Sequence, residues 1–542
     1  MPHTAVPLLP RPLEAAGAPG EFLLSAASTV SAEPGLEAVA LWLQGALRPA
    51  TGFLVMFDAG PADIALSLDH RLAPEAYRLE ASADGVHISG GGPAGVFYGC
   101  QSLLQLLPAA VFRRAPVSTV RWAVPTCTVE DSPRFGWRGA MLDVVRHFLP
   151  KHELLRFIDL MAMHKLNTLH LHLTDDQGWR MEILRYPRLV EVGSWRRESQ
   201  VGAGPDAPAD GRPHGGHYTQ DDLREITSYA AARFITVVPE IETPGHVQAA
   251  LAAYPELGVT GQPLEVRTRW GINHHVLNAE DATVEFFRNV LDEVMDVFPS
   301  AYIGVGGDEC PKGQWQADPR SRERARELGL ARVDDLQNWF IGQLDRHVSV
   351  RGRRILGWDE VLEGELSPTA TVASWRGMAG AVAAARRGHD VVCCPDDRAY
   401  LDYRQSELPT EPIPVSIPLT VADVYAFDPA PASLTPEQAK HILGGQANLW
   451  TEHIDSPRGL DYMAFPRLCA MAEALWSQAS GELEDFTARL REHLPRLDAV
   501  GVEYRRAEGP LPWQQRPGIP GRPETRAARD AHIAALVASI EA

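Results

Sequence analysis

From Phe135 onward the chain alternates short apolar runs with longer segments in which apolar residues recur at helical spacing. Apolar runs of this length suit buried parallel strands, and the longer segments suit helices that cover a sheet on one face. The runs predict strands at Arg138–Asp143, Thr168–Leu173, Ile235–Glu240, Tyr302–Gly306, Arg354–Trp358, Thr371–Trp375, Asp390–Cys394 and Gln446–Trp450. The longer segments predict helices at His152–His164, Gln220–Ala232, Ala282–Val297 and Val333–Val350. Strands and helices in this alternation predict an α/β fold, a (β/α)8 TIM barrel.

The residues before Phe135 follow a different pattern. Segments such as Ile64–Leu68, Ala76–Glu80 and Gly85–Ser89 alternate apolar and polar residues, as half-buried strands do. The apolar run Ala94–Leu107 has the length of a helix. Together these segments predict a small α+β domain in front of the barrel.

The pattern divides the 542-residue chain into three parts. The predicted α+β domain spans residues 1–132, and the predicted barrel spans residues 133–505. A C-terminal extension, residues 506–542, is rich in Pro and Gly at first and ends in a predicted helix, Glu524–Ile540. Because a chain of this length exceeds one average domain, several parts are expected.

Charge narrows the class of partner. The formal net charge is −19, which opposes binding to nucleic-acid phosphates or to an anionic membrane surface. We therefore expect an uncharged ligand, with no nucleic acid and no membrane as partners. The sequence has no uncharged apolar run of about 18 residues, the length that a transmembrane helix requires. Nothing in the sequence decides the oligomeric state.

Cysteine use and the start of the chain bear on the compartment. The six cysteines are too few for a disulfide framework, so we expect them to be reduced and mostly buried. The first 30 residues lack the basic and continuous apolar regions of a signal peptide. We therefore expect a cytoplasmic protein, with secretion as the alternative if a leader has been trimmed.

The run Tyr302–Glu309 combines a strand-like apolar stretch, a Gly pair and two adjacent acids. Glycine permits a sharp turn and a close approach of the backbone to a ligand, so Asp308 and Glu309 are expected at a strand's end. Adjacent carboxyl groups repel each other, which tends to keep one protonated and the other ionised. That arrangement suits acid/base catalysis. The same residues also suit an ordinary surface turn, so the run alone does not establish a function.

Aromatic and charged residues gather where the predicted strands end, which is where a barrel builds its active site. Trp358, Trp375 and Trp450 each end a separate strand. Indole faces stack on the C–H faces of a sugar ring, and charged groups bind its hydroxyls. The polar candidates are Arg138, Asp143, His170, His172, Asp175, Asp176, Glu240, Glu242, His246, Asp359, Glu360, Tyr400, Asp402 and Glu452. The set predicts a sugar-binding pocket.

Several of these residues also have a purely structural interpretation. A lone Trp is more often part of a core than a ligand platform, and Arg138 could be half of a structural ion pair. His170 and His172 alternate with leucines, as packing residues do. With Asp175 and His246 they could instead hold a metal ion. No Cys or HExxH spacing supports such a site.

Five separated segments form a series along the chain: Trp137–Val144, His164–Arg180, Val238–His246, Gly306–Lys312 and Asn448–Glu452. The series resembles glycoside hydrolase family 20, the β-N-acetylhexosaminidases. The resemblance spans essentially residues 1 to 500 and implies the family's small α+β domain followed by its barrel. Because several motifs occur in order, the agreement is far more specific than the Gly-Gly-Asp-Glu run alone.

The resemblance implies a role for each candidate residue. Glu309 is similar to the family's general acid/base, and Asp308 to the carboxylate that holds the substrate's 2-acetamido nitrogen. Tyr400 resembles the phenol that hydrogen-bonds the acetamido oxygen. The implied pocket walls are Trp358, Trp375 and Trp450; the implied hydroxyl-binding residues are Arg138, Asp402 and Glu452; and the implied pair that orients the acid/base is Asp175 and His246.

The implied reaction is the exo-acting, retaining removal of terminal GlcNAc or GalNAc from oligosaccharides such as chitooligosaccharides. Adjacent residues are poorly arranged to attack and protonate one carbon from opposite sides. The family's substrate-assisted route avoids this problem, because the acetamido oxygen attacks and forms an oxazolinium ion. Neither a metal nor an organic cofactor is expected. The sequence does not decide between GlcNAc and GalNAc, or the leaving group.

One departure from the family and three alternatives stay open. The family usually has His four residues before the catalytic Asp, where this chain has Gly304; we expect altered tuning with activity retained. A disaccharide-releasing relative is the nearest alternative. A carbohydrate-binding protein on a decayed barrel is another, although the intact acid pair argues against it. A diguanylate cyclase shares the Gly-Gly-Asp-Glu letters, but the barrel, the tryptophans and the acidic charge argue against that class.

Overall fold

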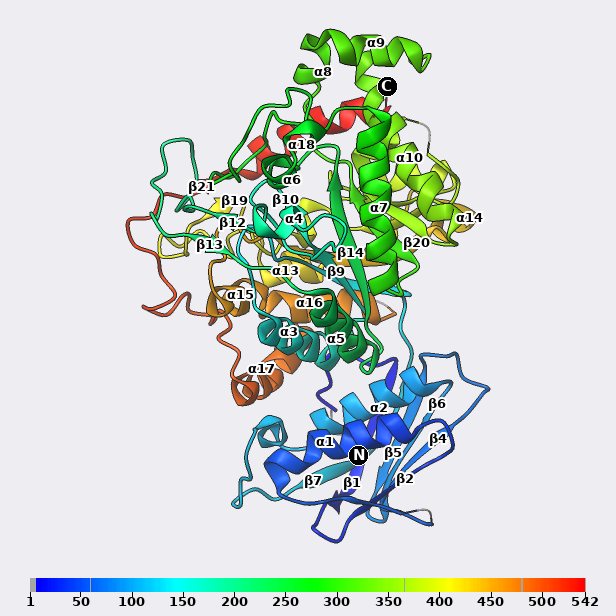
Figure 1. The fold of residues 1–542 in the computed structure, drawn as a ribbon. Coiled ribbons are helices and arrows are strands. Elements are labelled where there is room, and N and C mark those ends of the chain that lie inside the picture. The colour runs from blue at the N-terminus through cyan, green and yellow to red at the C-terminus, as the bar shows by residue number, and fades with distance from the viewer. Residues whose placement is uncertain (1–5, 59, 365, 479–480, 542) are drawn as a thin grey trace.

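The computed structural model describes residues 6–58, 60–364, 366–478 and 481–541. Residues 1–5 of the predicted first domain lie outside this description. The chain forms a small α+β unit and a large barrel, which occupy opposite ends of the molecule in Figure 1. Among the described residues, no helix combines the length and the apolar character that crossing a membrane requires.

The first unit is a seven-stranded sheet with two helices packed on it. The sheet has the order β1-β7-β5-β6-β4-β2-β3. Its strands are β1 (Glu14–Leu23), β2 (Thr29–Ala32), β3 (Met56–Phe57), β4 (Ile64–Leu68), β5 (Tyr77–Ser82), β6 (Gly85–Gly90) and β7 (Ala123–Asp131). The helices are α1 (Glu37–Thr51) and α2 (Pro93–Leu106), followed by the 3-10 turn η1 (Ala109–Phe112). The alternating burial of β5 and β6 explains why their sequences read as strands with one buried face.

The second unit is a closed barrel of eight parallel strands. They are β8 (Trp137–Asp143), β9 (Thr168–His172), β14 (Thr236–Thr243), β15 (Tyr302–Gly306), β16 (Arg354–Trp358), β17 (Thr371–Ser374), β18 (Asp390–Cys393) and β20 (Ile442–Leu449). Each predicted strand matches one of them within a few residues. The predicted TIM barrel preceded by a small domain is therefore confirmed.

Helices cover the outside of the barrel. They include α3 (Lys151–Met163), α5 (Gln220–Ala231), α7 (Asp281–Val297), α10 (Leu336–Val350), α11 (Ala379–Arg386), α16 (Arg467–Trp476) and α17 (Leu483–Val500). Further helical elements between the strands are α8 (Gly313–Ala317), α9 (Pro319–Glu327), the 3-10 turn η4 (Asp359–Glu363) and α12 (Asp396–Ala399). α7 shows why the sequence forms such a layer. Its buried residues recur at helical spacing, so one apolar face packs inward.

Register aligns polar residues near the carboxyl ends of three neighbouring strands. Asp143 pairs with His172, His172 with Glu240, and Glu240 with Gly304. Partners on neighbouring parallel strands point the same way, so these residues form one layer of the barrel. The layer places ionisable side chains directly beneath the loops that follow the strands.

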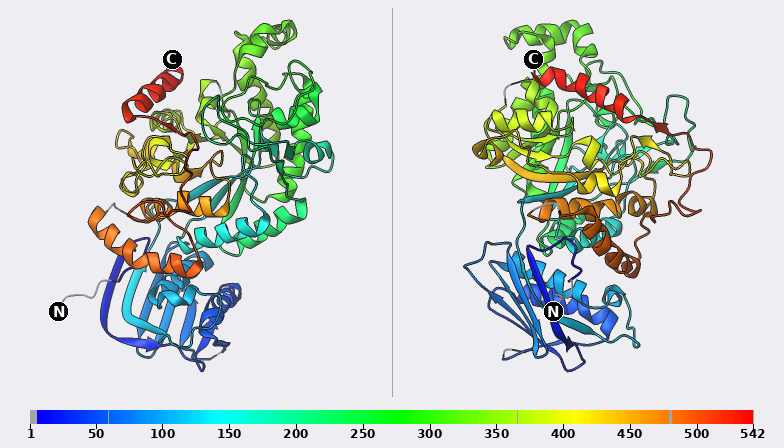
Figure 2. Two further views of the ribbon diagram at one scale, coloured as in Figure 1. Left: turned by 90° about the vertical axis from the view of Figure 1, so that its left-hand side faces the viewer. Right: turned by 180° about the vertical axis from the view of Figure 1, so that it is seen from behind.

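The two ends of the barrel face different surroundings. The α+β unit lies at one end, and α8, α9 and the C-terminal helix α18 (Arg526–Glu541) lie at the other (Figures 1 and 2). The short strands β19 (Val415–Ser416) and β21 (Arg522–Pro523) pair in parallel just before α18. This pairing ties the C-terminal segment to the barrel loops and fixes where the last helix begins.

Candidate functional site

A cavity opens at the carboxyl ends of the barrel strands. Its lining residues are Arg146, His246, Asp308, Glu309, Trp358, Trp375, Tyr400, Asp402, Tyr403, Trp450, Glu452, Arg529 and His532. They come from the carboxyl ends of seven different strands or the loops that follow these strands, and from α18. The candidates that the sequence predicted and that the structure brings together here are His246, Asp308, Glu309, Trp358, Trp375, Tyr400, Asp402, Trp450 and Glu452.

The backbone after β15 turns sharply to present the two adjacent acids. Gly306 has φ 72° and Gly307 has φ 95°, in the left-handed region that glycine adopts without steric cost. A Cβ at Gly306 would lie 1.8 Å from Glu242 Oε2, so any other residue would displace that buried carboxyl group. Glu309 itself has φ 44°. Non-glycine residues held in this region cost about 1–3 kcal/mol and cluster at functional sites.

His246 lies between the acid pair and a second pair of carboxylates. Its Nε2 is 3.7 Å from Asp308 Oδ2 and 3.5 Å from Glu309 Oε2, and its Nδ1 is 3.3 Å from Asp175 Oδ1. Burial alone would lower the pKa of His246, but Asp175 and the other carboxylates hold that pKa well above its usual value. The charged imidazolium form of His246 is therefore favoured, and the ring lies between the acid pair and Asp175.

The two adjacent acids differ in exposure. The Asp308 side chain is 13% exposed, whereas that of Glu309 is 35% exposed. Burial, opposed by His246 and reinforced by Glu309, raises the pKa of Asp308 to about 6. Glu309 thus stands at the opening of the cavity and Asp308 stands inside it. The geometry separates the two carboxyl groups into different environments, as acid/base chemistry requires.

A hydrogen-bonded network lies beneath the cavity. His172 contacts Glu240 Oε2 through Nδ1 at 2.6 Å and Asp175 Oδ2 through Nε2 at 3.0 Å. Burial lowers the pKa of His172, but these two carboxylates raise it to about 9. Both ring nitrogens therefore carry protons and donate, which leaves His172 no lone pair for a metal ion.

Aromatic rings enclose the rest of the cavity. The Trp358 and Trp450 centroids are 5.8 Å apart, and Tyr400 stacks on Trp375 at 6.2 Å with an interplanar angle of 28°. Trp375 Nε1 donates to Glu360 Oε2 at 3.1 Å, which fixes the orientation of that indole. Trp358 is 1% exposed, and its Nε1 has no hydrogen-bond partner among the described residues. The three predicted tryptophans therefore line one cavity instead of three separate parts of the core.

Three ionisable residues, Arg146, Asp402 and Glu452, complete the polar lining. Burial raises the pKa of Asp402 well above its usual value and also raises the pKa of Glu452. Arg146 sits beside them, 9% exposed, with its guanidinium carbon 4.9 Å from the Trp450 ring centre. It pairs with Asp175 at 2.7 Å. Carboxyl groups and an Arg beside an indole face provide the acceptors and donors that sugar hydroxyls need.

The prediction for Arg138 was wrong. Its side chain is fully buried at the other end of the barrel, where Nη2 donates to Glu75 Oε1 at 2.8 Å and to Tyr98 Oη at 3.0 Å. Arg138 is the second residue of β8, so it lies at the amino end of that strand, against the α+β unit. Arg146, which follows the carboxyl end of β8, lines the cavity in its place.

The sequence analysis missed four lining residues: Arg146, Tyr403, Arg529 and His532. Arg146 carried a usable signal, because an Arg just after the end of a barrel strand lies on the catalytic face. Tyr403 follows the predicted candidates Tyr400 and Asp402 in the same loop. Arg529 and His532 lie in the last helix, where no local pattern indicates the barrel opening. Asp175 does not line the cavity but supports His246 from behind.

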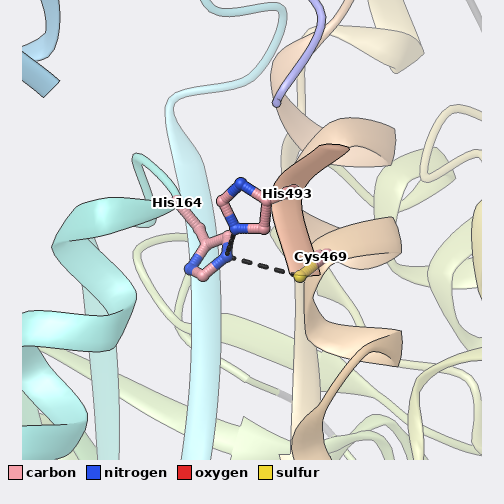
Figure 3. Close-up of side chains that lie close together, drawn as sticks. All are labelled: His164, Cys469 and His493. Atoms are coloured by element: carbon pink, nitrogen blue, oxygen red, sulfur yellow. Dashed lines mark hydrogen bonds between the residues drawn. The ribbon is translucent and has the colours of Figure 1, made fainter. Parts of the chain in front are cut away.

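A separate group of ligand-type atoms joins three helices away from the cavity (Figure 3). His164 Nδ1 donates to Leu160 O at 2.7 Å, which leaves its Nε2 to accept from His493 Nε2 at 3.0 Å and from Cys469 Sγ at 3.3 Å. Arg496 Nη1 lies 3.4 Å from His493 Nδ1 and can only donate, which fixes the tautomer of that ring. Burial lowers the pKa of His164 to about 4. The group is a neutral packing contact between α3, α16 and α17.

Comparison with known proteins identifies the family of both units. Residues 135–479 match the model of the glycosyl hydrolase family 20 catalytic domain, and residues 5–132 match domain 2 of the same family. A beta-hexosaminidase of Porphyromonas gingivalis is 41% identical over 522 residues, which are 94% of this chain and 65% of that protein. The chain therefore spans less than two thirds of the length of this relative. A beta-N-acetylhexosaminidase of Cellulomonas fimi is 33% identical over 96% of this chain and 99% of its own length.

Solved structures share the fold of this chain. The GH20 exo beta-N-acetylglucosaminidase of Vibrio harveyi, in complex with N-acetylglucosamine, has a TM-score of 0.83 and 35% identity over 93% of this chain and 79% of that one. The GH20 beta-N-acetylhexosaminidase of Streptomyces coelicolor has a TM-score of 0.81 and 33% identity, and the match covers 96% of this chain and 100% of that one. The two family models match the barrel and the α+β unit, and the chain belongs to glycoside hydrolase family 20.

Proposed function

We propose that the protein is an exo-acting, retaining β-N-acetylhexosaminidase that removes terminal non-reducing GlcNAc or GalNAc from oligosaccharides such as chitooligosaccharides. One observation carries the proposal: Asp308, Glu309 and Tyr400 line a single cavity with three tryptophans at the carboxyl ends of the strands. The relatives named above support the class of reaction. The substrate range and the mechanism are inferences from the cavity.

The exposure of the two acids supports removal of a terminal sugar. Asp308 and the tryptophans enclose the interior of the cavity, whereas Glu309 stands at its opening. A sugar held inside would place its glycosidic oxygen near Glu309 and direct the leaving group toward solvent. Arg146, Asp402 and Glu452 would bind the ring hydroxyls inside the cavity. A chain end fits this arrangement, whereas a sugar in the middle of a chain would have to extend in both directions.

In the first step, Glu309 donates its proton to the glycosidic oxygen while the acetamido oxygen of the substrate attacks the anomeric carbon. The bond to the leaving group breaks, and a cyclic oxazolinium ion forms. Asp308 accepts the acetamido N–H and offsets the positive charge that develops there. The Tyr400 hydroxyl donates to the acetamido oxygen and orients it. Each contact grows stronger as charge develops, which is the condition for lowering the barrier.

In the second step, Glu309 takes a proton from water, and the resulting hydroxide attacks the anomeric carbon and opens the ring. The two displacements at that carbon give overall retention. His246 positions the acid pair in both steps, because it lies within 3.7 Å of each carboxylate. The protonated ring also offsets the negative charge on Asp308, so that this carboxylate can ionise inside a buried site.

The spacing of the acids does not by itself identify the nucleophile. An oxygen of Asp308, an oxygen of Glu309 and a nitrogen of His246 all lie within 4.8 Å of one another. Retaining enzymes with a carboxylate nucleophile have their two carboxyl groups about 5–5.5 Å apart. Tyr400 and Trp375 favour the substrate-assisted route, because stacked rings beside Asp308 form a wall that suits an acetamido group.

A panel of p-nitrophenyl β-glycosides tests the proposal. We expect hydrolysis of the GlcNAc and GalNAc glycosides and a rate at least 10³-fold lower for the glucoside, which lacks the acetamido nucleophile, because oriented internal groups contribute a large part of such barriers. Chitobiose and chitotriose should release one GlcNAc at a time from the non-reducing end. Equal rates on the glucoside, or release of intact disaccharides, would contradict the proposal.

A further inference from the structure

The C-terminal helix α18 reaches the catalytic cavity from outside the matched catalytic domain. That match ends at residue 479, whereas Arg529 and His532 line the cavity with Tyr400 and Asp402. The two residues are three positions apart in a helix, so they share one face. Figure 2 shows α18 at the end of the barrel opposite the α+β unit.

The helix is held there by contacts at several points along its length. Arg376 Nη1 donates to Leu536 O at 3.2 Å, and Ile533 and Leu536 pack against the main hydrophobic core. Before the helix, Glu524 N donates to Ser416 O at 2.9 Å, in continuation of the pairing between β19 and β21. These contacts fix both the start and the middle of α18 over the loops that follow β16, β17 and β18.

Arg529 contacts the loop that carries Tyr400. Its Nε donates to Asp396 Oδ2 at 2.5 Å, and its guanidinium carbon is 5.7 Å from the Tyr403 ring centre. The Asp396 side chain is 1% exposed, and the Tyr403 hydroxyl also donates to it at 3.1 Å. Burial raises the pKa of Asp396, and Arg529 counteracts that rise. Arg529 thus supplies the positive charge that a buried carboxylate requires.

Asp396 connects this ion pair to the reacting groups. It begins α12, whose last residue directly precedes Tyr400, and its backbone N–H donates to Trp375 O at 3.0 Å. The Tyr403 ring packs on Tyr400 with centroids 5.6 Å apart. A short sequence of direct contacts therefore leads from Arg529 through Asp396 and Tyr403 to Tyr400.

We propose that Arg529 is a positioning residue for the reaction: from α18 it holds the α12 loop so that the Tyr400 hydroxyl meets the substrate's acetamido oxygen. The inference rests on the proposed function, because it assigns Tyr400 to that oxygen. It makes α18 part of the catalytic site, although the helix lies beyond the catalytic-domain match.

A double-mutant cycle in the full-length chain tests the inference. Tyr400→Phe should lower kcat/KM for the GlcNAc glycoside at least tenfold in the wild type, and less than threefold in an Arg529→Ala background. The reason is that a displaced Tyr400 has already lost its contact. Arg529→Ala alone should lower kcat/KM about as much as Tyr400→Phe, mostly through kcat. Arg529→Lys, which keeps a positive charge near Asp396, should recover part of the loss.

Arg526→Ala is the matched control: Arg526 lies on the same helix and also faces α12, but its pairs with Asp397 and Asp423 are long, at 3.8 and 3.6 Å, and its side chain is 42% exposed. Its kcat/KM should stay within twofold of the wild type. Thermal unfolding and the near-UV circular dichroism spectrum should show that each variant is folded at the assay temperature. If Arg529→Ala does not fold, the same cycle with Arg529→Lys gives the answer.

The outcomes distinguish this inference from the proposed function. If the wild type hydrolyses 2-acetamido sugars but Tyr400→Phe costs the same factor in both backgrounds, Arg529 does not act through Tyr400 and the inference is overturned. If the wild type does not hydrolyse 2-acetamido sugars at all, the proposed function itself fails.

Discussion

The two ends of the barrel contain similar side chains with opposite roles. At the amino end, the guanidinium carbon of Arg138 lies 4.9 Å from the Trp476 ring centre, and at the carboxyl end that of Arg146 lies 4.9 Å from Trp450. Each Arg pairs with a carboxylate: Arg138 with Glu75 and Arg146 with Asp175. Residue type and burial therefore do not distinguish a structural Arg from a functional one.

Hydrogen-bond satisfaction distinguishes the surroundings of Arg138 from the lining of the cavity. Every guanidinium nitrogen of Arg138 donates to a protein acceptor. At the carboxyl end, buried polar atoms without a hydrogen-bond partner among the described residues include Asp308 Oδ1, Asp402 Oδ1 and Trp358 Nε1. Because an unpaired buried polar atom is costly, such a cluster indicates a site that a polar ligand completes. The contacts of Arg138 are therefore complete within the protein, whereas those of the cavity lining are not.

The largest expected effect is on catalysis at the carboxyl end. Glu309→Gln should lower kcat for an alkyl or sugar leaving group about 10²–10⁴-fold, because general acid help matters most for a basic leaving oxygen. Aryl glycosides with acidic phenols should lose much less. Steady-state rates across leaving groups of increasing pKa measure this difference. Near-equal losses on all leaving groups would remove Glu309 from the acid role.

A pair of substitutions compares the two arginines directly. Arg138→Met should lower the free energy of unfolding by about 3–5 kcal/mol, because it leaves a buried ion pair and its hydrogen bonds broken. The kcat/KM of the remaining folded protein should be unchanged. By contrast, Arg146→Met should raise KM about 10–100-fold, because it removes charge-assisted hydrogen bonds to the sugar hydroxyls. Chemical denaturation and steady-state kinetics separate the two effects. A raised KM in Arg138→Met would contradict the assignment of that end as structural.

Substitutions at Gly304 test the packing of the barrel interior beneath the site. A Cβ at this position would lie 2.7 Å from Glu240 Cβ and 2.9 Å from its Cα, closer than real contacts allow. Gly304→Ala and Gly304→His should therefore destabilise the protein, by about 1–3 kcal/mol for a modest overpacking and more for the larger side chain. Gly45→Ala is the control, because no atom lies within 4 Å of its added Cβ. A fully stable Gly304→His would show that Glu240 moves aside easily.

The pH dependence sharpens the role of Asp308. Because its folded pKa is raised from 3.8 to about 6, the folded state favours the protonated form. Stability should therefore fall as the pH rises from about 4 through 6, and Asp308→Asn should be more stable than the wild type at pH 7 by at most about 3 kcal/mol. Catalysis needs the ionised form, so kcat/KM should fall below about pH 6. A lower stability of Asp308→Asn than of the wild type at pH 7 would contradict this account.

The sequence was sufficient for the fold because buried parallel strands form continuous apolar runs that differ from the amphipathic helices between them. It was also sufficient for most of the site, because residues just after such runs meet at one end of a barrel. The prediction for Arg138 failed because this residue lies near the start of its strand, and the two ends of a barrel strand lie at opposite ends of the barrel. Arg529 and His532 could not be placed, because a long irregular segment separates their helix from the barrel. Only tertiary contacts bring that helix to the cavity.

The most direct test of the central claim uses the substrate's own nucleophile. We expect kcat/KM to fall progressively when the acetamido methyl group of an activated GlcNAc glycoside carries one, two and three fluorine atoms, because fluorine makes the carbonyl oxygen a weaker nucleophile. A thiazoline analogue of the cyclic intermediate should inhibit strongly, as intermediate mimics do, and Asp308→Ala should weaken that inhibition. Rates that do not respond to fluorination, or a covalent bond trapped on a protein carboxylate, would contradict the substrate-assisted mechanism.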